Sequence, residues 1–374
     1  MKTLLILIFF FITLPFSTFA QTNQTPSADQ IENGRRLQLA TETSFRLTSA
    51  RAYHKGVNGK EKNLNMAIRY YEEVAGLGHI DSEYFLGLIY QVELKQFDRA
   101  FYWNMRASEH GHWNAQLNLA IAYLEGQNIE VDPIQGYKWF KLAYRNSGEV
   151  ATQLLPAIEQ IESQLDKTQI SEGQRLADEW MVEFERKKNE PKKKPEIVIE
   201  QVGLSTNIAI KGSLQATGNV GCVDITQVSN TEIPPNLFLG FLDCVRKNDY
   251  DKGIEMFILA FMFGQFDGHR IEDPTAGSGI SQLRREAVSL LTPDQRTSFD
   301  NHLKEHYFRA SEKRLTFCNK IENIGYPTYH PKYMILVGLS AFDGIEGNGL
   351  KHFFEPEEQW IEVATPNCPV DYFK

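Results

Sequence analysis

The architecture follows from one segment, Ala100-Phe-Tyr-Trp103-Asn-Met-Arg-Ala107-Ser-Glu-His-Gly111, because it recurs along the chain. A similar segment begins 33 residues earlier at Ala67, and another begins 36 residues later at Gly136. Trp103 and Ala107 are four positions apart, so they lie on one helical face, where the small residue lets a second helix approach closely. The period predicts stacked helix pairs, each of which buries its apolar face against the next pair.

A second, shorter apolar segment follows each of the first two copies, at residues 84–90 and 115–123. Residues 52–56 are part of an incomplete earlier unit. We expect Gly78 and Gly111 to end helices in the left-handed conformation that glycine adopts readily. The residues predicted to pack the repeats together are Tyr70, Ala75, Gly78, Trp103, Ala107, Gly111, Trp139 and Ala143.

These residues resemble the Sel-one-like repeat, a member of the tetratricopeptide-like superfamily, over roughly residues 38–181. The usual glycine-containing turn between repeats is replaced at residues 91–98 by Gln-Val-Glu-Leu-Lys-Gln-Phe-Asp. The resemblance implies a helical-repeat solenoid of helix-turn-helix pairs, which we place at residues 30–185. It also implies an adaptor or scaffold of the kind common in bacterial envelopes, that is, a protein-binding role without a named partner.

The first twenty residues have the pattern of a secretory signal peptide. Lys2 precedes an apolar run from Leu4 to Phe16, and Ala20 closes a segment with small residues at the positions that a signal peptidase requires. We therefore expect residues 1–20 to be cleaved near Ala20 and the mature protein to lie in the periplasm without a stable membrane anchor. A retained anchor is the alternative, although the apolar run is shorter than a bilayer span of about 20 residues.

Composition excludes some classes of protein. The 374 residues include 42% hydrophobic side chains, which suits packed globular domains rather than a disordered chain. The formal charge of −9, from 39 basic and 48 acidic residues, argues against a nucleic-acid partner, since phosphate contacts require a basic face. The length allows two domains.

A run of lysines and prolines at residues 186–199 predicts a charged linker. Beyond it we expect a second domain, residues 200–374, which is mostly helical with one or two short strands within 196–209. Apolar stripes predict helices near 235–245 and 254–262, and Ser281–Leu291 predicts a third. Thr292 and Gln295 form a capping box for a fourth, which reaches about residue 309. After Cys318 the chain is predicted to be irregular.

All four cysteines lie in this second domain. Export to an oxidising space favours two disulfides, and the three possible pairings cannot be told apart from the sequence. The alternative is four free buried thiols. The cysteines are Cys222, Cys244, Cys318 and Cys368.

Two clusters could carry chemistry. His302, Glu305 and His306 fit the His-x-x-Glu-His order of inverted zinc peptidases, but an exposed helix with ordinary histidines explains them better. His269 with Asp267 or Asp273 could form an acid–base pair, whereas an arginine flanked by acids is more often part of a buried ion network. We therefore predict no catalytic residues, no metal and no cofactor.

Tyr326, Tyr329 and Tyr333 lie in a proline-rich segment and are candidates for partner binding, although most aromatic residues here are expected in the core. We predict a non-catalytic periplasmic protein that binds a protein partner on the concave face of the repeats or between the domains. A more specific prediction is that it is an immunity protein that inhibits a toxic envelope-acting effector, such as a phospholipase of type VI secretion. Alternatives are a scaffold for cell-wall enzymes, a metal-dependent hydrolase and a solute-binding module.

Overall fold

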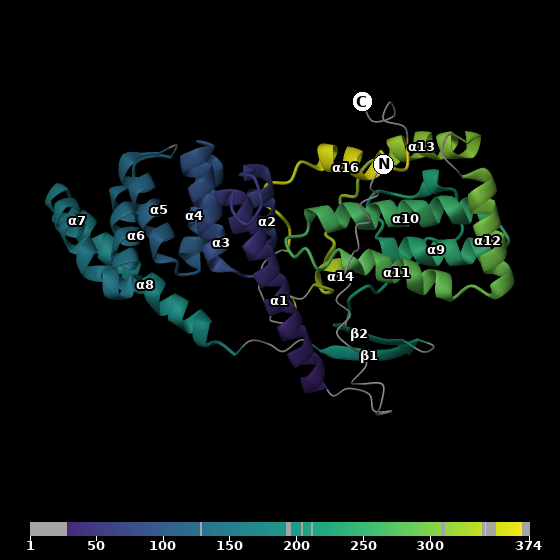
Figure 1. Ribbon diagram of the computed structural model, residues 1–374, viewed down its shortest axis with the longest axis horizontal. Coiled ribbons are helices and arrows are strands. Elements are labelled where there is room, and N and C mark those ends of the chain that lie inside the picture. Colours follow the sequence, from purple (N-terminus) through teal and green to yellow (C-terminus); the bar gives the residue numbers. More distant parts are fainter. Residues whose placement is uncertain are drawn as a thin grey trace.

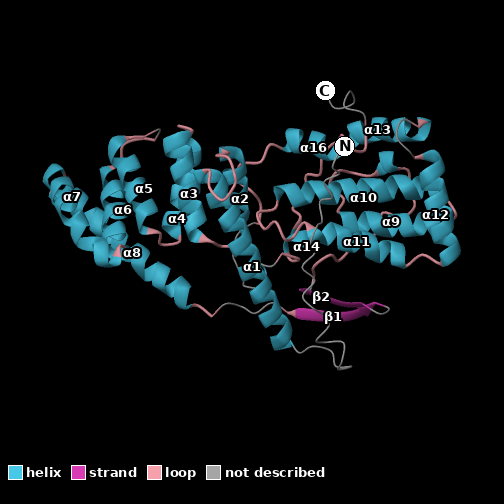
Figure 2. Cartoon of the chain, in the orientation of Figure 1, coloured by secondary structure: helices cyan, strands magenta, loops and turns pink. Residues whose placement is uncertain are grey.

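The computed structural model describes residues 28–127, 129–191, 196–202, 205–210, 212–307, 311–338, 341 and 349–368. The predicted signal peptide lies outside the described residues. The described part is mainly α-helical, with one two-stranded sheet (Figure 1; Figure 2). None of its helices is both long and apolar enough to span a bilayer.

The first half is a row of helices in which each of the first six contacts the next in sequence, and the eighth packs against the sixth (Figure 1). The helices are α1 (Ala28–Lys55), α2 (Leu64–Gly76), α3 (Ile80–Leu88), α4 (Phe97–Glu109), α5 (Trp113–Glu125), α6 (Pro133–Asn146), α7 (Ala151–Gln164) and α8 (Lys167–Asn189). Side-chain caps fix where several of the helices begin. The side chain of Asn63 accepts a hydrogen bond from the amide of Met66 at the start of α2, and that of Asp132 accepts hydrogen bonds from the amides of Ile134 and Gln135 at the start of α6.

Two apolar clusters hold this row together. One gathers Tyr71 and Leu86 around Trp103, and the other gathers Leu119 and Leu142 around Trp139. Gly78 and Gly111 have φ of +85° and +87°, so both adopt the left-handed conformation predicted from the sequence. Five of the residues expected to pack the repeats are buried, namely Ala75, Trp103, Ala107, Trp139 and Ala143. Gly78 is exposed and Gly111 is half-buried, and Tyr70 is half-buried and stacks on Tyr53 with 5.9 Å between ring centroids.

The departure from the repeat at residues 91–98 has a structural counterpart. The chain leaves α3 through a π-helical turn, η2 (Ile89–Glu93), and then places Lys95 at φ +55°, where other repeats place glycine. The amide of Gln96 donates to the carbonyl of Tyr90 at 2.9 Å, which closes the turn. This local change directs Tyr90, Leu94 and Gln96 toward a cavity described below.

The second half begins with an antiparallel hairpin, in which Ile197 pairs with Ile210 and Val202 with Ser205. Helix α10 is central, since α9, α11, α12 and α16 all contact it. The elements are β1 (Ile197–Val202), β2 (Ser205–Ile210), α9 (Pro234–Arg246), α10 (Tyr250–Arg270), α11 (Ser278–Ser289), α12 (Pro293–His306), α13 (Glu312–Ile324), α14 (Lys332–Ile335) and α16 (Pro356–Ala364).

Two disulfides link parts of this half: Cys222 with Cys244, and Cys318 with Cys368. The predicted linker is shorter than expected, because α8 continues to Asn189 and β1 already begins at Ile197. Residues 192–195 of it lie outside the described part.

The prediction of irregular chain after Cys318 holds for residues 325–331 but is wrong for the segments on either side of them. That cysteine lies within α13, whose first turn is capped by the Ser311 hydroxyl, and α14 and α16 follow it. Helix α12 does start with the predicted capping box of Thr292 and Gln295, and it ends at His306.

Candidate functional site

The two halves meet where the end of α2 touches the loop after α10. Gly76 lies so close to the backbone of Glu272 that an added Cβ would be 2.0 Å from its carbonyl oxygen. Arg106, on α4, donates from Nε to Glu83 at 2.6 Å and from Nη2 to Glu272 at 3.2 Å. Glu83 is only 1% exposed, so this guanidinium neutralises a buried carboxylate while it joins the two halves.

His110 adds a titratable group to this contact. Its Nδ1 lies 2.7 Å from the second carboxylate oxygen of Glu83. That hydrogen bond raises the pKa of His110 above its usual value, and burial opposes the shift. The Glu83 carboxylate is therefore held by two cationic partners when His110 is protonated.

Aromatic side chains pack beside these charges. Tyr102 stacks on His352 with 4.1 Å between ring centroids and meets Phe353 edge-on at 5.1 Å. Arg99, one turn earlier on α4, lies over the Phe353 ring at 4.8 Å. Residues 351–353 therefore form a strap of chain that rests against α4.

A cavity of about 380 Å³ opens beside this strap. We call it the junction cavity. Its walls come from α2, the turn at η2, the start of α4, the end of α10, the strap and α16. The lining residues are Asn65, Ile68, Arg69, Glu72, Tyr90, Leu94, Gln96, Arg99, His269, Lys351, Phe353, Phe354, Glu355, Glu358 and Gln359.

Charges of both signs face one another across the junction cavity. Burial raises the pKa of the Glu72 carboxyl, and the positive charges of Lys351 and Arg99 act in the opposite direction. Among the residues that the structure describes, Glu72, Arg99 and Lys351 form no ion pair with one another or with any other side chain. His269 is kept toward its neutral form, because burial lowers its pKa.

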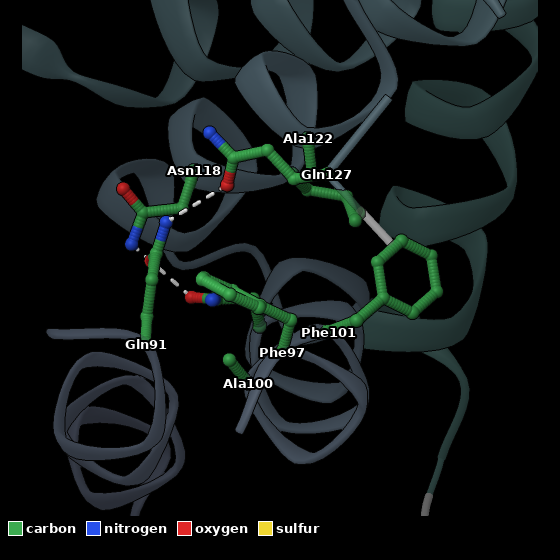
Figure 3. A pocket seen from close by; sticks show the side chains of 9 residues that line it. Gln91, Phe97, Ala100, Phe101, Asn118, Ala122 and Gln127 are labelled. Atoms are coloured by element: carbon green, nitrogen blue, oxygen red, sulfur yellow. Dashed lines mark hydrogen bonds between the residues drawn. The ribbon is translucent and has the colours of Figure 1, made fainter. Parts of the chain in front are cut away.

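A second surface lies on the repeats themselves, at a shallow groove of only about 10 Å³ between η2, α4 and α5 (Figure 3). We call it the repeat groove. Gln91 donates to Gln127 across it at 3.3 Å, and Asn118 donates to Asn104 at 3.2 Å. Phe97 at its edge is 39% exposed.

Two further apolar side chains are exposed near the repeat groove. Val92 in η2 is 53% exposed, and Val131 is 60% exposed and lies against the end of α5 at Gly126. On α4, Phe97 and Phe101 point away from the face that carries Arg99 and Arg106, since helical residues advance by about 100° each. The repeat groove and the junction thus use opposite sides of the same helix.

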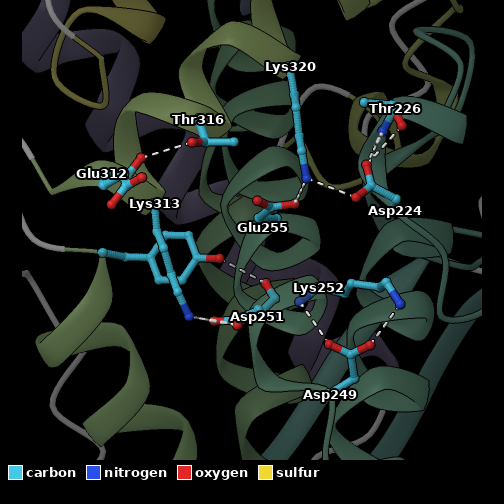
Figure 4. A network of polar contacts seen from close by, with 11 residues as sticks. Asp224, Thr226, Asp249, Asp251, Lys252, Glu255, Glu312, Lys313, Thr316 and Lys320 are labelled. Carbon is cyan, nitrogen blue, oxygen red and sulfur yellow. Dashed lines mark hydrogen bonds and ion pairs between the residues drawn. The ribbon is translucent and has the colours of Figure 1, made fainter.

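A third set of charges lies within the second half, and its members neutralise one another (Figure 4). Lys320 donates to both Asp224 and Glu255 at 2.8 Å, and Lys313 contacts Asp251 at 2.6 Å. Burial raises the pKa of Asp224, but the hydrogen bonds from Lys320 and Thr226 lower it to about 2. These pairs fasten α13 to α10 and leave little charge for a ligand.

The residues with candidate chemistry lie in structural roles. His302 stacks on Tyr250 at 4.8 Å between ring centroids, and its Nδ1 lies 2.9 Å from the carbonyl oxygen of Ser298. The nearest carboxylate contact of His306 is Glu305, at 3.9 Å. The described residues contain no group of three His, Cys, Asp or Glu side chains placed to hold a metal ion.

Asp267 and Arg270 form the buried ion network that the sequence favoured over an acid–base pair. Asp267 is fully buried, and Arg270 donates to it from Nε at 2.9 Å and Nη2 at 2.7 Å. Burial raises the pKa of Asp267, and Arg270 with two tyrosine hydroxyls opposes that rise. His269 points elsewhere, into the junction cavity.

The prediction that three tyrosines offer a binding patch needs correction. Tyr329 and Tyr333 direct their hydroxyl groups inward to Asp267, and Tyr333 is buried. Tyr326 is half-buried, and its hydroxyl donates to Glu357 at 3.1 Å. The buried Asp267 carboxylate takes the hydroxyl groups of Tyr329 and Tyr333 inward, because it requires hydrogen-bond donors there.

Comparison with a family model supports the description of the first half as helical repeats. Residues 49–79, 80–112 and 113–147 each match the Sel1 repeat. A crystal structure of a protective antigen from uropathogenic Escherichia coli, which displays an SLR fold, is 18% identical to this chain with a TM-score of 0.27. That match covers 51% of this chain and 48% of the antigen. No curated protein sequence matches this chain significantly.

Sel1 repeats imply a scaffold for protein–protein interaction. Residues 49–147 of this chain are three consecutive Sel1 repeats.

Proposed function

We propose that this protein is a non-catalytic scaffold that binds a protein partner in the repeat groove. The observation that supports this site most directly is the exposed Phe97 at the edge of a groove lined with amides, with Val92 and Val131 exposed on the segments that adjoin it. Exposed apolar residues that lie together are frequent at protein interfaces, and aromatic ones often contribute most of the binding energy.

The amide side chains suit the same purpose. Gln91 and Gln127 are half-buried, and each amide has hydrogen-bonding capacity beyond the bond that joins them. Such groups can bond to the peptide groups of a partner segment, while Phe97 and Phe101 contact its side chains. The repeat groove also lies on the side of α4 opposite the one that contacts the C-terminal half.

The sharper proposal is an exported immunity protein that neutralises a toxic envelope-acting effector, such as a phospholipase delivered by type VI secretion. Three features support it: the predicted signal peptide, two disulfides that suit an oxidising compartment, and a Sel1 scaffold. The net charge of −9 favours electrostatic attraction of a basic partner.

The test is affinity capture from periplasmic extract with the tagged mature chain, followed by mass spectrometry. We expect one stoichiometric secreted hydrolase whose activity falls on binding. Phe97→Asp should abolish capture, whereas Leu290→Asp, a control at a 63% exposed position in the other half, should not.

Other outcomes would contradict parts of the proposal. Several cell-wall enzymes at lower yield would replace the immunity role with an envelope scaffold. A partner retained equally by Phe97→Asp would show that the repeat groove is not the binding surface. Unchanged survival of cells that lack the protein, in competition with a neighbour that delivers the effector, would refute the immunity role.

A further inference from the structure

The junction cavity contains charged side chains that the fold leaves unpaired. Glu72 comes from α2, Arg99 from α4 and Lys351 from the strap, so three separate segments bring them together. Within the described part of the chain none of the three has an ion-pair partner, although Glu72 interacts electrostatically with both cations. Half-buried charges are costly to leave unpaired, and such a group in a cavity indicates a ligand.

Arg99 is held in place by contacts that do not consume its charge. Its guanidinium lies 5.6 Å from the centre of the Tyr90 ring and 4.8 Å from that of Phe353. One Nη donates to the Tyr90 hydroxyl at 3.4 Å. A guanidinium has five N–H groups, so several remain for a carboxylate, which it binds with well-defined geometry.

The balance of charge identifies the class of ligand. Three cationic side chains, Arg69, Arg99 and Lys351, and three carboxylates, Glu72, Glu355 and Glu358, line the cavity, while burial favours neutral His269. A phosphate or a polyamine would meet as much repulsion as attraction there. A molecule that carries one charge of each sign and has no net charge matches the charges that line this cavity.

We propose that the junction cavity binds a small zwitterion, a free amino acid or a short peptide with both ends unblocked. Its carboxylate contacts Arg99 and Lys351, and its ammonium group contacts Glu72. The volume of about 380 Å³ lies in the lower part of the range of small-molecule sites. This site is distinct from the repeat groove, which has other lining residues on the opposite side of α4.

The experiment is calorimetric titration of the full mature chain with trialanine, N-acetyl-trialanine and trialanine amide. We expect the free peptide to bind and each blocked peptide to bind at least about tenfold more weakly, because each lacks one charge. Equal binding of all three peptides would overturn the proposal. So would the absence of heat with alanine and trialanine up to about 10 mM, a concentration that detects even millimolar affinity.

Three variants assign the contacts. Glu72→Gln should make the free and N-acetylated peptides equivalent, and Arg99→Gln should narrow the difference between the free and amidated peptides, since Lys351 still contacts the carboxylate. Arg69→Gln is the control, because Arg69 lines the same cavity but is already paired with Glu73 at 3.2 Å. If all three variants weaken binding alike, the assignment is wrong. The blocked peptides test the proposal on the unaltered chain, so a variant that fails to fold does not remove the test.

Discussion

The contact between Gly76 and Glu272 makes the junction open to a direct test by Gly76→Ala. The new Cβ would lie 2.0 Å from the Glu272 carbonyl oxygen, 2.5 Å from its carbonyl carbon and 3.2 Å from the Asp273 nitrogen. All three are backbone atoms, and the Glu272 amide is itself tied to the carbonyl of Gly349 at 2.9 Å. No side-chain rotation relieves this overlap, so α2 must move away from the C-terminal half.

The size of the effect follows from two opposing terms. Overpacking of this kind costs about 1–3 kcal/mol, whereas alanine stabilises a helix interior by up to about 1 kcal/mol relative to glycine. Gly34→Ala is the matched control, since Gly34 lies within α1 and no heavy atom falls within 4 Å of its added Cβ. We expect the control to keep or gain stability and Gly76→Ala to lose about 1–3 kcal/mol relative to it.

Hydrogen exchange followed by mass spectrometry measures this locally. Amides of residues 271–273 and 349–353 should exchange about five- to more than a hundredfold faster in Gly76→Ala, the range that corresponds to that free energy. Exchange in α12, far from the contact, should not change. If Gly76→Ala raises the melting temperature as Gly34→Ala does and leaves exchange unaltered, the junction described here is wrong.

Three further predictions concern stability. Arg106→Met should lower the free energy of unfolding by about 2–3 kcal/mol, because it leaves buried Glu83 without its guanidinium, and adding Glu83→Gln should restore part of the loss; an effect below about 0.5 kcal/mol would contradict the buried ion pair. Since Glu83 raises the pKa of His110 above its unfolded value, the stability from this pair is full below about pH 6.5 and falls as the pH rises through the folded pKa. Between about pH 5 and 8, a range that includes the ordinary histidine pKa, the melting temperature should therefore decline less with rising pH in His110→Gln than in the unaltered protein. An unchanged slope of melting temperature against pH would exclude this contribution. Replacing Cys318 and its partner by serine should cost about 4 kcal/mol, against about 3 kcal/mol for the Cys222 pair, because the bridged cysteines are separated by 50 and 22 residues; chemical denaturation that ranks the pairs in reverse would refute this loop argument.

The repeats could be predicted because their signal is local and periodic. Trp103 and Ala107 recur as Trp139 and Ala143, and one helical turn separates each pair, so sequence spacing alone places them on one face. The positive φ of Gly78 could be predicted for the same reason, since the need for a left-handed residue at a helix end is local in sequence.

The junction could not be predicted in this way. Gly76, Glu272 and Lys351 are brought together by the packing of two halves of the chain, and nothing in the residues around each of them indicates the other two. Tyr333 illustrates the same limit: aromatic residues in a proline-rich segment suggest a binding loop, but a buried carboxylate more than sixty positions earlier takes its hydroxyl inward.

The row of repeats packs against the C-terminal half near one of its ends. The contacts with the C-terminal half described above come from α2 and α4, while α5, α6 and α7 lie progressively farther from it (Figure 1). Mechanically, the distal helices form an arm, and the contact at Arg106 and Glu272 is close to its pivot. A slight rotation there displaces α7 much farther than it displaces the pivot, so a load applied to the distal repeats acts on the junction with leverage.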